Sequence, residues 1–128
     1  MKTLLLAATA LIALSGAAHA QRQSGITGQK LVQLCTSDPK SVEGCTAFID
    51  GVADTAYFYQ TLRPANGSKG GPLPAYLCVP PTTTGPQLRD IVVQFVQKKP
   101  EQSTREASGV VLRALDASFR CQKKAGTE

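Results

Sequence analysis

The chain has 128 residues, with 14 Lys and Arg against 9 Asp and Glu, a formal net charge of +5, four Cys and one His. This length suits one small domain rather than two. The basic residues are scattered and no aromatic stripe is interleaved with them, which argues against a nucleic-acid partner.

The first 20 residues have the pattern of a secretory signal peptide. Lys2 supplies a short positive region, an apolar run extends from Leu4 to Leu14, and Ala18-His19-Ala20 offers a cleavage site. As a helix this run would extend only about 16 Å against the roughly 30 Å of a bilayer core, so we expect no membrane anchor. We therefore predict a signal peptide over residues 1–20, a single mature domain over residues 21–128, and a periplasmic destination.

Cleavage after Ala20 would remove His19, the only histidine, and leave 108 residues with 13 basic and 9 acidic side chains. A chain without His has neither the usual general base nor the usual zinc ligand. Asp50 and Asp54 share a helix face, as a glycosidase pair would, but this spacing is ordinary on solvated helices. We predict no catalytic residue, no metal, no cofactor and no enzymatic activity.

All four Cys lie in the part predicted to be exported, where an even count implies two disulfides. Three pairings are possible. We favour Cys35 with Cys45, which closes a short loop, and Cys78 with Cys121, which ties the last helix to a mid-chain loop. The spacings contain no Cys-x-x-Cys pair that would favour a metal.

The first two helices are predicted from apolar periodicity and capping residues. The first follows Ser24 as a possible N-cap and covers Ile26–Leu34. The second begins after Asp38-Pro39 and extends over roughly Lys40–Leu62. Its apolar stripe contains Cys45, Phe48, Ile49, Val52, Ala56 and Tyr59.

Three aromatic residues are consecutive near the end of this second helix. At 100 degrees per residue they face different directions, so we expect Tyr59 in the core and Tyr57 or Phe58 at a protein interface. Gly51, inside the same helix, is interpreted as permitting a close approach of another helix.

A long irregular loop is predicted over Arg63–Ala75, because its Pro and Gly residues sustain neither helical nor strand periodicity. Loops of this length in a small domain are often functional. The candidate partner-binding residues are Tyr57, Phe58, Arg63, Asn66, Gly67, Ser68, Lys69, Gly70 and Gly71.

Two further helices follow. The third helix follows a capping box of Thr84 and Gln87 and ends at Pro100. The last helix follows a second predicted capping box, of Ser103 and Glu106, and ends near Phe119. The apolar face of the third helix is Leu88, Ile91, Val92, Phe95 and Val96, and that of the last helix is Ala107, Val110, Val111, Ala114, Leu115 and Phe119. With no convincing strand, the predicted fold is all-α, a small disulfide-stapled bundle of about four helices.

Several short segments occur in a distinctive order along the chain. The segments are Cys35, the run Cys45-Thr46-Ala47-Phe48-Ile49-Asp50-Gly51-Val52-Ala53-Asp54, Cys78-Val79-Pro80, Pro100-Glu101, Ala114-Leu115 and Phe119-Arg120-Cys121. In this order they resemble the Tai/Rap immunity proteins of type VI secretion. The resemblance spans about Leu31 to Cys121. The family commonly has proline before the last cysteine, where this chain has Arg120.

The resemblance implies a small helical periplasmic protein, often a dimer, that binds and blocks a peptidoglycan amidase toxin, and its order of cysteines agrees with the favoured pairing. On this interpretation the loop Arg63–Ala75 would enter the groove of the toxin, with Tyr57 or Phe58 as an anchor. A second interpretation stays open: a general periplasmic binding or stress-chaperone-like helical protein without a dedicated toxin. A toxin gene next to this one would favour the first, and exposure of apolar surface in acid the second.

Overall fold

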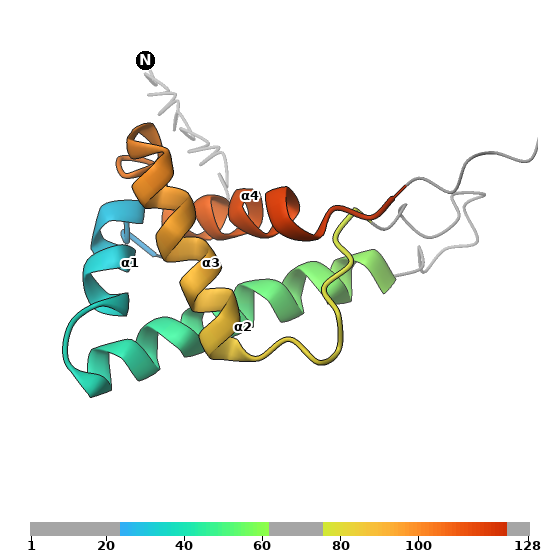
Figure 1. Cartoon of the computed structure of the whole chain (residues 1–128), viewed down its shortest axis with the longest axis horizontal. Helices are drawn as coiled ribbons and strands as arrows, with labels where there is room; N and C mark the ends of the chain where they lie inside the picture. The colour runs from blue at the N-terminus through green and yellow to red at the C-terminus, as the bar shows by residue number, and fades with distance from the viewer. Residues whose placement is uncertain (1–23, 62–75, 123–128) are drawn as a thin grey trace, which may run out of the picture.

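The computed structural model describes residues 24–61 and 76–122. The predicted signal peptide therefore lies outside the described residues. Within these ranges the chain forms four α-helices and one 3-10 helix, with two isolated β-bridges and no strand (Figure 1). The elements are α1 (Gly28–Cys35), α2 (Pro39–Thr61), α3 (Gly85–Lys98), η1 (Pro100–Gln102) and α4 (Ala107–Phe119). The predicted all-α class is confirmed.

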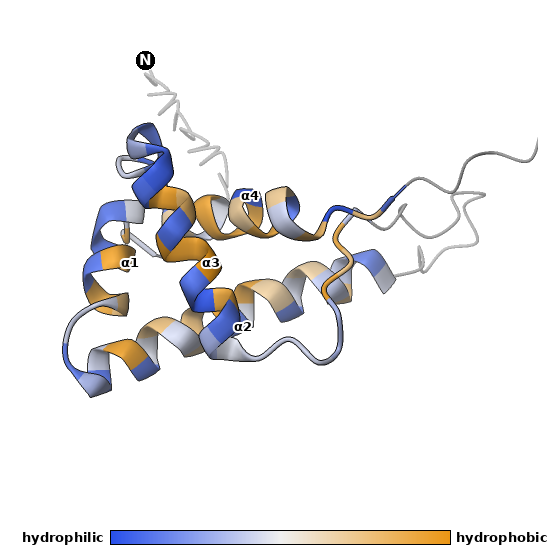
Figure 2. Cartoon of the chain, viewed as in Figure 1, coloured by the Kyte–Doolittle hydropathy of each residue, from blue (hydrophilic) through white to orange (hydrophobic). Residues whose placement is uncertain are grey.

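The long helix α2 is the base on which the other three helices pack. It contacts α1, α3 and α4, and α3 crosses over both α2 and α4 (Figure 1). Apolar residues lie where the helices meet, and the turn between α3 and α4 is hydrophilic (Figure 2). No helix in the described ranges is long and apolar enough to cross a bilayer. The buried apolar cluster is Leu31, Cys35, Cys45, Ile49, Ala56, Leu77, Leu88, Val92, Ala107, Val111, Ala114 and Leu115.

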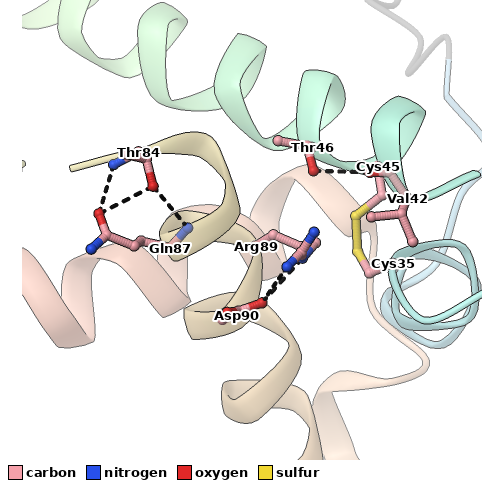
Figure 3. A network of polar contacts seen from close by, with 8 residues as sticks. All are labelled: Cys35, Val42, Cys45, Thr46, Thr84, Gln87, Arg89 and Asp90. Atoms are coloured by element: carbon pink, nitrogen blue, oxygen red, sulfur yellow. Dashed lines mark hydrogen bonds and ion pairs between the residues drawn. A yellow bond between two sulfur atoms is a disulfide. The ribbon is translucent and has the colours of Figure 1, made fainter. Parts of the chain in front are cut away.

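The helix starts predicted for α2 and α3 are confirmed. The carboxylate of Asp38 accepts hydrogen bonds from the Ser41 hydroxyl at 2.7 Å and from the backbone N–H groups of Ser41 and Lys40. The bonds from Ser41 lower the pKa of Asp38 below its ordinary value of 3.8. At α3, the Thr84 hydroxyl accepts from the Gln87 N–H, and the Gln87 side chain accepts from the Thr84 N–H at 2.8 Å (Figure 3).

The first helix begins two residues later than predicted, and Thr27 rather than Ser24 is its N-cap. The cause of this shift is a contact with a distant part of the chain. The backbone of residues 26–29 pairs with residues 103–107, through Gly28 N–H to Arg105 O at 2.8 Å and Ala107 N–H to Ile26 O at 2.9 Å. A Cβ at Gly28 would lie 2.6 Å from the Gln102 carbonyl oxygen, so this glycine permits the close approach.

The predicted capping box of Ser103 and Glu106 is wrong. The Ser103 hydroxyl donates to the Pro100 carbonyl, and α4 begins at Ala107 without a side-chain cap at Glu106. Residues 100–103 form η1 and its closing turn, and the Ser103 carbonyl accepts from the Gln29 N–H at 2.8 Å. The turn is thus held by its own backbone hydrogen bonds and by α1, without a side-chain cap for α4.

Two expectations about α2 are also wrong. Tyr59 is 57% exposed and is no core residue. The last turn of α2 contacts the segment 76–78 through Gln60, so the neighbouring Tyr59 side chain is turned toward solvent. A Cβ at Gly51 would meet nothing within 4 Å, so none of the described helices approaches this glycine closely.

Candidate partner-binding site

The C-terminal end of α2 exposes an unusual density of aromatic side chains. Tyr57 is 68% exposed, Phe58 and Tyr59 are each 57% exposed, and Tyr76 is exposed beside them. The rings of Phe58 and Tyr59 make an edge contact with their centroids 6.2 Å apart. We call Tyr57, Phe58, Tyr59 and Tyr76 the aromatic end. Exposed tyrosine and phenylalanine are frequent anchors of protein interfaces.

Two hollows flank the aromatic end. The larger is a cleft of about 830 Å³, which we call the acidic cleft. Its lining residues come from α2, from the segment 77–83 and from the start of α3. They are Asp50, Ala53, Asp54, Tyr57, Gln60, Thr61, Leu77, Cys78, Val79, Pro80, Pro81, Thr83, Gly85 and Leu88.

The smaller hollow is a groove of about 490 Å³ between α2 and α4, which we call the apolar groove. Tyr59 and Tyr76 lie at its side, so the aromatic end borders both hollows. Its lining residues are Ala47, Phe48, Gly51, Val52, Thr55, Ala56, Tyr59, Tyr76, Ser108 and Leu112.

Gln60 fixes one wall of the acidic cleft, and the sequence analysis missed it. Its side-chain oxygen accepts from the N–H groups of Tyr76 and Leu77, both at 2.8 Å, and its amide nitrogen donates to the Leu77 carbonyl at 3.3 Å. This polar side chain is only 9% exposed. It lies four residues after Ala56 on the buried stripe of α2, and a glutamine at such a core position is the signal that could have revealed it.

A disulfide secures the same segment from the other side. Cys78 is bonded to Cys121, with a Cα–Cα distance of 5.0 Å. The Cys78 N–H donates to the Phe119 carbonyl at 2.8 Å, and the Cys121 N–H donates to the Tyr76 carbonyl at 3.0 Å. Residues 76–78 are therefore held to both α2 and the end of α4 (Figure 1).

The second disulfide joins α1 to α2, between Cys35 and Cys45, at a Cα–Cα distance of 5.2 Å (Figure 3). Both bonds are the pairings favoured from the sequence. Since all four cysteines are bonded, none offers a thiolate. The described residues contain no group of three His, Cys, Asp or Glu that could hold a metal ion.

The acidic cleft takes its charge from Asp50 and Asp54 alone among the described residues that line it. Asp50 reaches the first turn of α3, since a Cβ at Gly85 would lie 2.6 Å from its Oδ2 atom. The positive end of a helix dipole favours a carboxylate there. The arrangement offers a charged and aromatic surface for recognition.

Only some of the predicted partner-binding residues can be placed. Tyr57 and Phe58 lie on the last two turns of α2, exposed as expected. The others lie outside the described residues; they are Arg63, Asn66, Gly67, Ser68, Lys69, Gly70 and Gly71. Of the described residues nearest to them in the chain, Thr61 lines the acidic cleft and Tyr76 belongs to the aromatic end.

Comparison with known proteins identifies the family of this chain. No curated protein matches the chain. The family model of the Rap1a immunity proteins matches residues 27–121, a range that holds both disulfides and all the described helices. Disulfides and this family together indicate an extracytoplasmic location. The chain belongs to the Rap1a immunity protein family, and is therefore a non-catalytic protein that binds and inhibits a cognate secreted toxin.

Proposed function

We propose that this protein is a periplasmic immunity protein that inhibits a peptidoglycan amidase delivered by type VI secretion. The observation that carries the proposal is the family match over residues 27–121. The amidase specificity rests on the resemblance of the segments around the four cysteines to the Tai/Rap proteins. The resemblance also implies that many members are dimers, which light scattering of the purified protein tests directly.

The periplasmic location rests on the predicted signal peptide as well as on the disulfides. Export with cleavage after Ala20 leaves a mature chain of 108 residues that begins at Gln21. Intact-mass measurement of protein extracted from the periplasm tests this. An uncleaved chain of 128 residues would contradict it.

The proposed mode of action is competitive inhibition. A cell-wall hydrolase cleaves its substrate in a groove, so a projecting feature of the inhibitor must fill that groove. The aromatic end supplies exposed anchors, and the segment Arg63–Ala75 supplies further contacts. Tyr57 and Phe58 are exposed at the point where that segment begins, which supports this assignment.

The test begins with a search for a toxin gene beside this one, and uses a peptidoglycan amidase found there. Purified amidase is assayed on peptidoglycan with increasing amounts of this protein, and the expected result is inhibition that saturates at a fixed stoichiometry. Lack of inhibition, or protection against a toxin of another chemistry only, would refute the amidase specificity.

The contact surface is tested with the variant Tyr57→Ala/Phe58→Ala. Losing two interface anchors should weaken binding by roughly 30-fold or more, since one such residue is commonly worth about 2 kcal/mol. The control is Gln97→Ala, an exposed position on α3 away from both hollows. Equal affinity of both variants would place the interface elsewhere.

The apolar groove is the observation that favours the alternative, a chaperone-like protein without a dedicated toxin. An apolar hollow bordered by exposed aromatic residues can hold an unfolded segment. Suppression of client aggregation by the purified protein, together with failure to inhibit any neighbouring toxin, would support that alternative instead.

A further inference from the structure

The acidic cleft contains carboxylates for which the described residues provide no partner. Asp90 pairs with Arg89 at 2.9 Å, and Asp116 pairs with Arg120. Asp50 and Asp54 make no hydrogen bond or ion pair within the described ranges, although the chain carries 14 Lys and Arg. Glu43 and Glu101 are also without a partner there, but they line neither hollow.

The cleft wall on α2 is a regular stripe. Asp50, Asp54, Tyr57 and Thr61 follow one another at steps of three and four residues, so their side chains lie on one helix face. Two carboxylates at this spacing have Cβ atoms about 5–6 Å apart. One guanidinium with its five N–H donors can reach both, and the ring of Tyr57 can stack on it.

A second wall of the cleft is apolar. It consists of Leu77, Val79, Pro80 and Pro81, with Leu88 from α3. The aliphatic part of a long cationic side chain packs well on such a surface while its charged end meets the carboxylates. A volume of about 830 Å³ is large enough for several residues of a peptide.

This wall is also preorganised. Gln60 holds the backbone of Tyr76 and Leu77, and the disulfide holds Cys78 to Cys121. Because the wall needs little ordering when a partner arrives, less of the interaction free energy is lost on binding.

We propose that the acidic cleft binds an arginine-bearing extended segment of the protein toxin. The identity of the partner rests on the proposed function. The chemistry rests on two unpaired carboxylates, a stacking ring and a rigid apolar wall in one hollow. Although the chain has a net charge of +5, the two carboxylates make this cleft complementary to a cationic group.

The first experiment needs no toxin. Acetyl-Gly-Arg-Gly-amide is titrated into the isotopically labelled protein, and amide shifts of residues 50–61 are followed by NMR. The isosteric peptide with neutral citrulline in place of arginine is the ligand control. We expect saturable binding of the arginine peptide, weakened at least about tenfold with citrulline or in the variant Asp50→Asn/Asp54→Asn.

A matched protein control separates local from general electrostatics. Glu43→Gln/Glu101→Gln removes the same two charges from exposed positions outside the cleft and should leave the arginine peptide's affinity within about twofold. Equal weakening by this control, or equal binding of the citrulline peptide, would overturn the proposal. Binding that emerges only in Arg63→Gln/Lys69→Gln would also overturn it, because the chain's own cations would then occupy the cleft.

The second experiment measures toxin affinity for the same variants, with thermal melts to verify their folding. A loss of at least about tenfold in Asp50→Asn/Asp54→Asn, with the control unchanged, supports the cleft as the toxin contact. If the toxin is inhibited as strongly by that variant as by the natural protein, the cleft proposal fails while the immunity function stands. If no amidase is inhibited by the natural protein, the proposed function fails, and the peptide titration still decides the cleft chemistry.

Discussion

Replacing Gln60 by leucine tests whether the cleft wall depends on one buried side chain. The Gln60 amide satisfies the N–H groups of Tyr76 and Leu77 and the carbonyl of Leu77. Tyr76 is exposed, so water can replace its lost partner, but Leu77 is only 6% exposed. The variant Gln60→Leu therefore leaves one buried donor and one buried acceptor of Leu77 unpaired.

Each such group costs about 1–3 kcal/mol, and leucine returns part of this by burying apolar surface. We expect Gln60→Leu to lower the free energy of unfolding by about 2–4 kcal/mol. For a domain of this size, that lowers the Tm by roughly 10–25 °C.

The assay is urea denaturation with both disulfides intact, combined with hydrogen exchange of the Leu77 amide. Gln97→Leu makes the same chemical change at an exposed position of α3 and should stay within about 0.5 kcal/mol of the natural protein. A loss below about 1 kcal/mol in Gln60→Leu, with the Leu77 amide still protected, would refute the reasoning.

Three further predictions follow from packing, capping and cross-linking. Gly28→Ala should lower the free energy of unfolding by about 1–3 kcal/mol, because a Cβ there would lie 2.6 Å from the backbone carbonyl oxygen of Gln102. Gly51→Ala should raise it by up to about 1 kcal/mol, and denaturation midpoints that move in the same direction would contradict this pair. The pKa of Asp38 in the folded protein is lowered below 3.8, so its ionised cap stabilises the fold above that pH, and this contribution is lost as the pH falls through the folded pKa. Asp38→Asn should therefore reduce the fall of the Tm with decreasing pH in this range, and an unchanged slope of Tm against pH would refute the argument. Replacing Cys78 and Cys121 together by Ser should lower the free energy of unfolding by about 4 kcal/mol, and replacing Cys35 and Cys45, which close a shorter loop, by about 3 kcal/mol. Calorimetry that gives the reverse order would show that loop length does not decide the effect.

Local signals in the sequence were sufficient where local chemistry decides the structure. The Asp38 cap and the Thr84–Gln87 capping box are satisfied by atoms within three residues, so the starts of α2 and α3 could be predicted. The apolar stripes of α3 and α4 likewise identified most of the buried residues of these helices.

The predictions failed where a distant backbone replaces a local partner. Ser103 looked like a cap, but its turn is held by Gln29, more than 70 positions earlier. Tyr59 fitted the apolar period, yet the last turn of α2 faces a short extended segment rather than a helix. Gln60 has no local partner at all, so only the tertiary structure shows what it binds. The acidic cleft depends on the same long-range contact.

The two residues that flank segment 62–75 are held by contacts outside that segment. Thr61 ends a packed helix, and Tyr76 is fixed by Gln60 and by the backbone of Cys121. Doubling the length of a flexible connection costs only about 0.6 kcal/mol in closure entropy. Substitutions and insertions between Thr61 and Tyr76 can therefore accumulate while the helices keep their packing. An immunity lineage that must follow a changing toxin can therefore vary the proposed contact residues here at little cost to the stability of the helices.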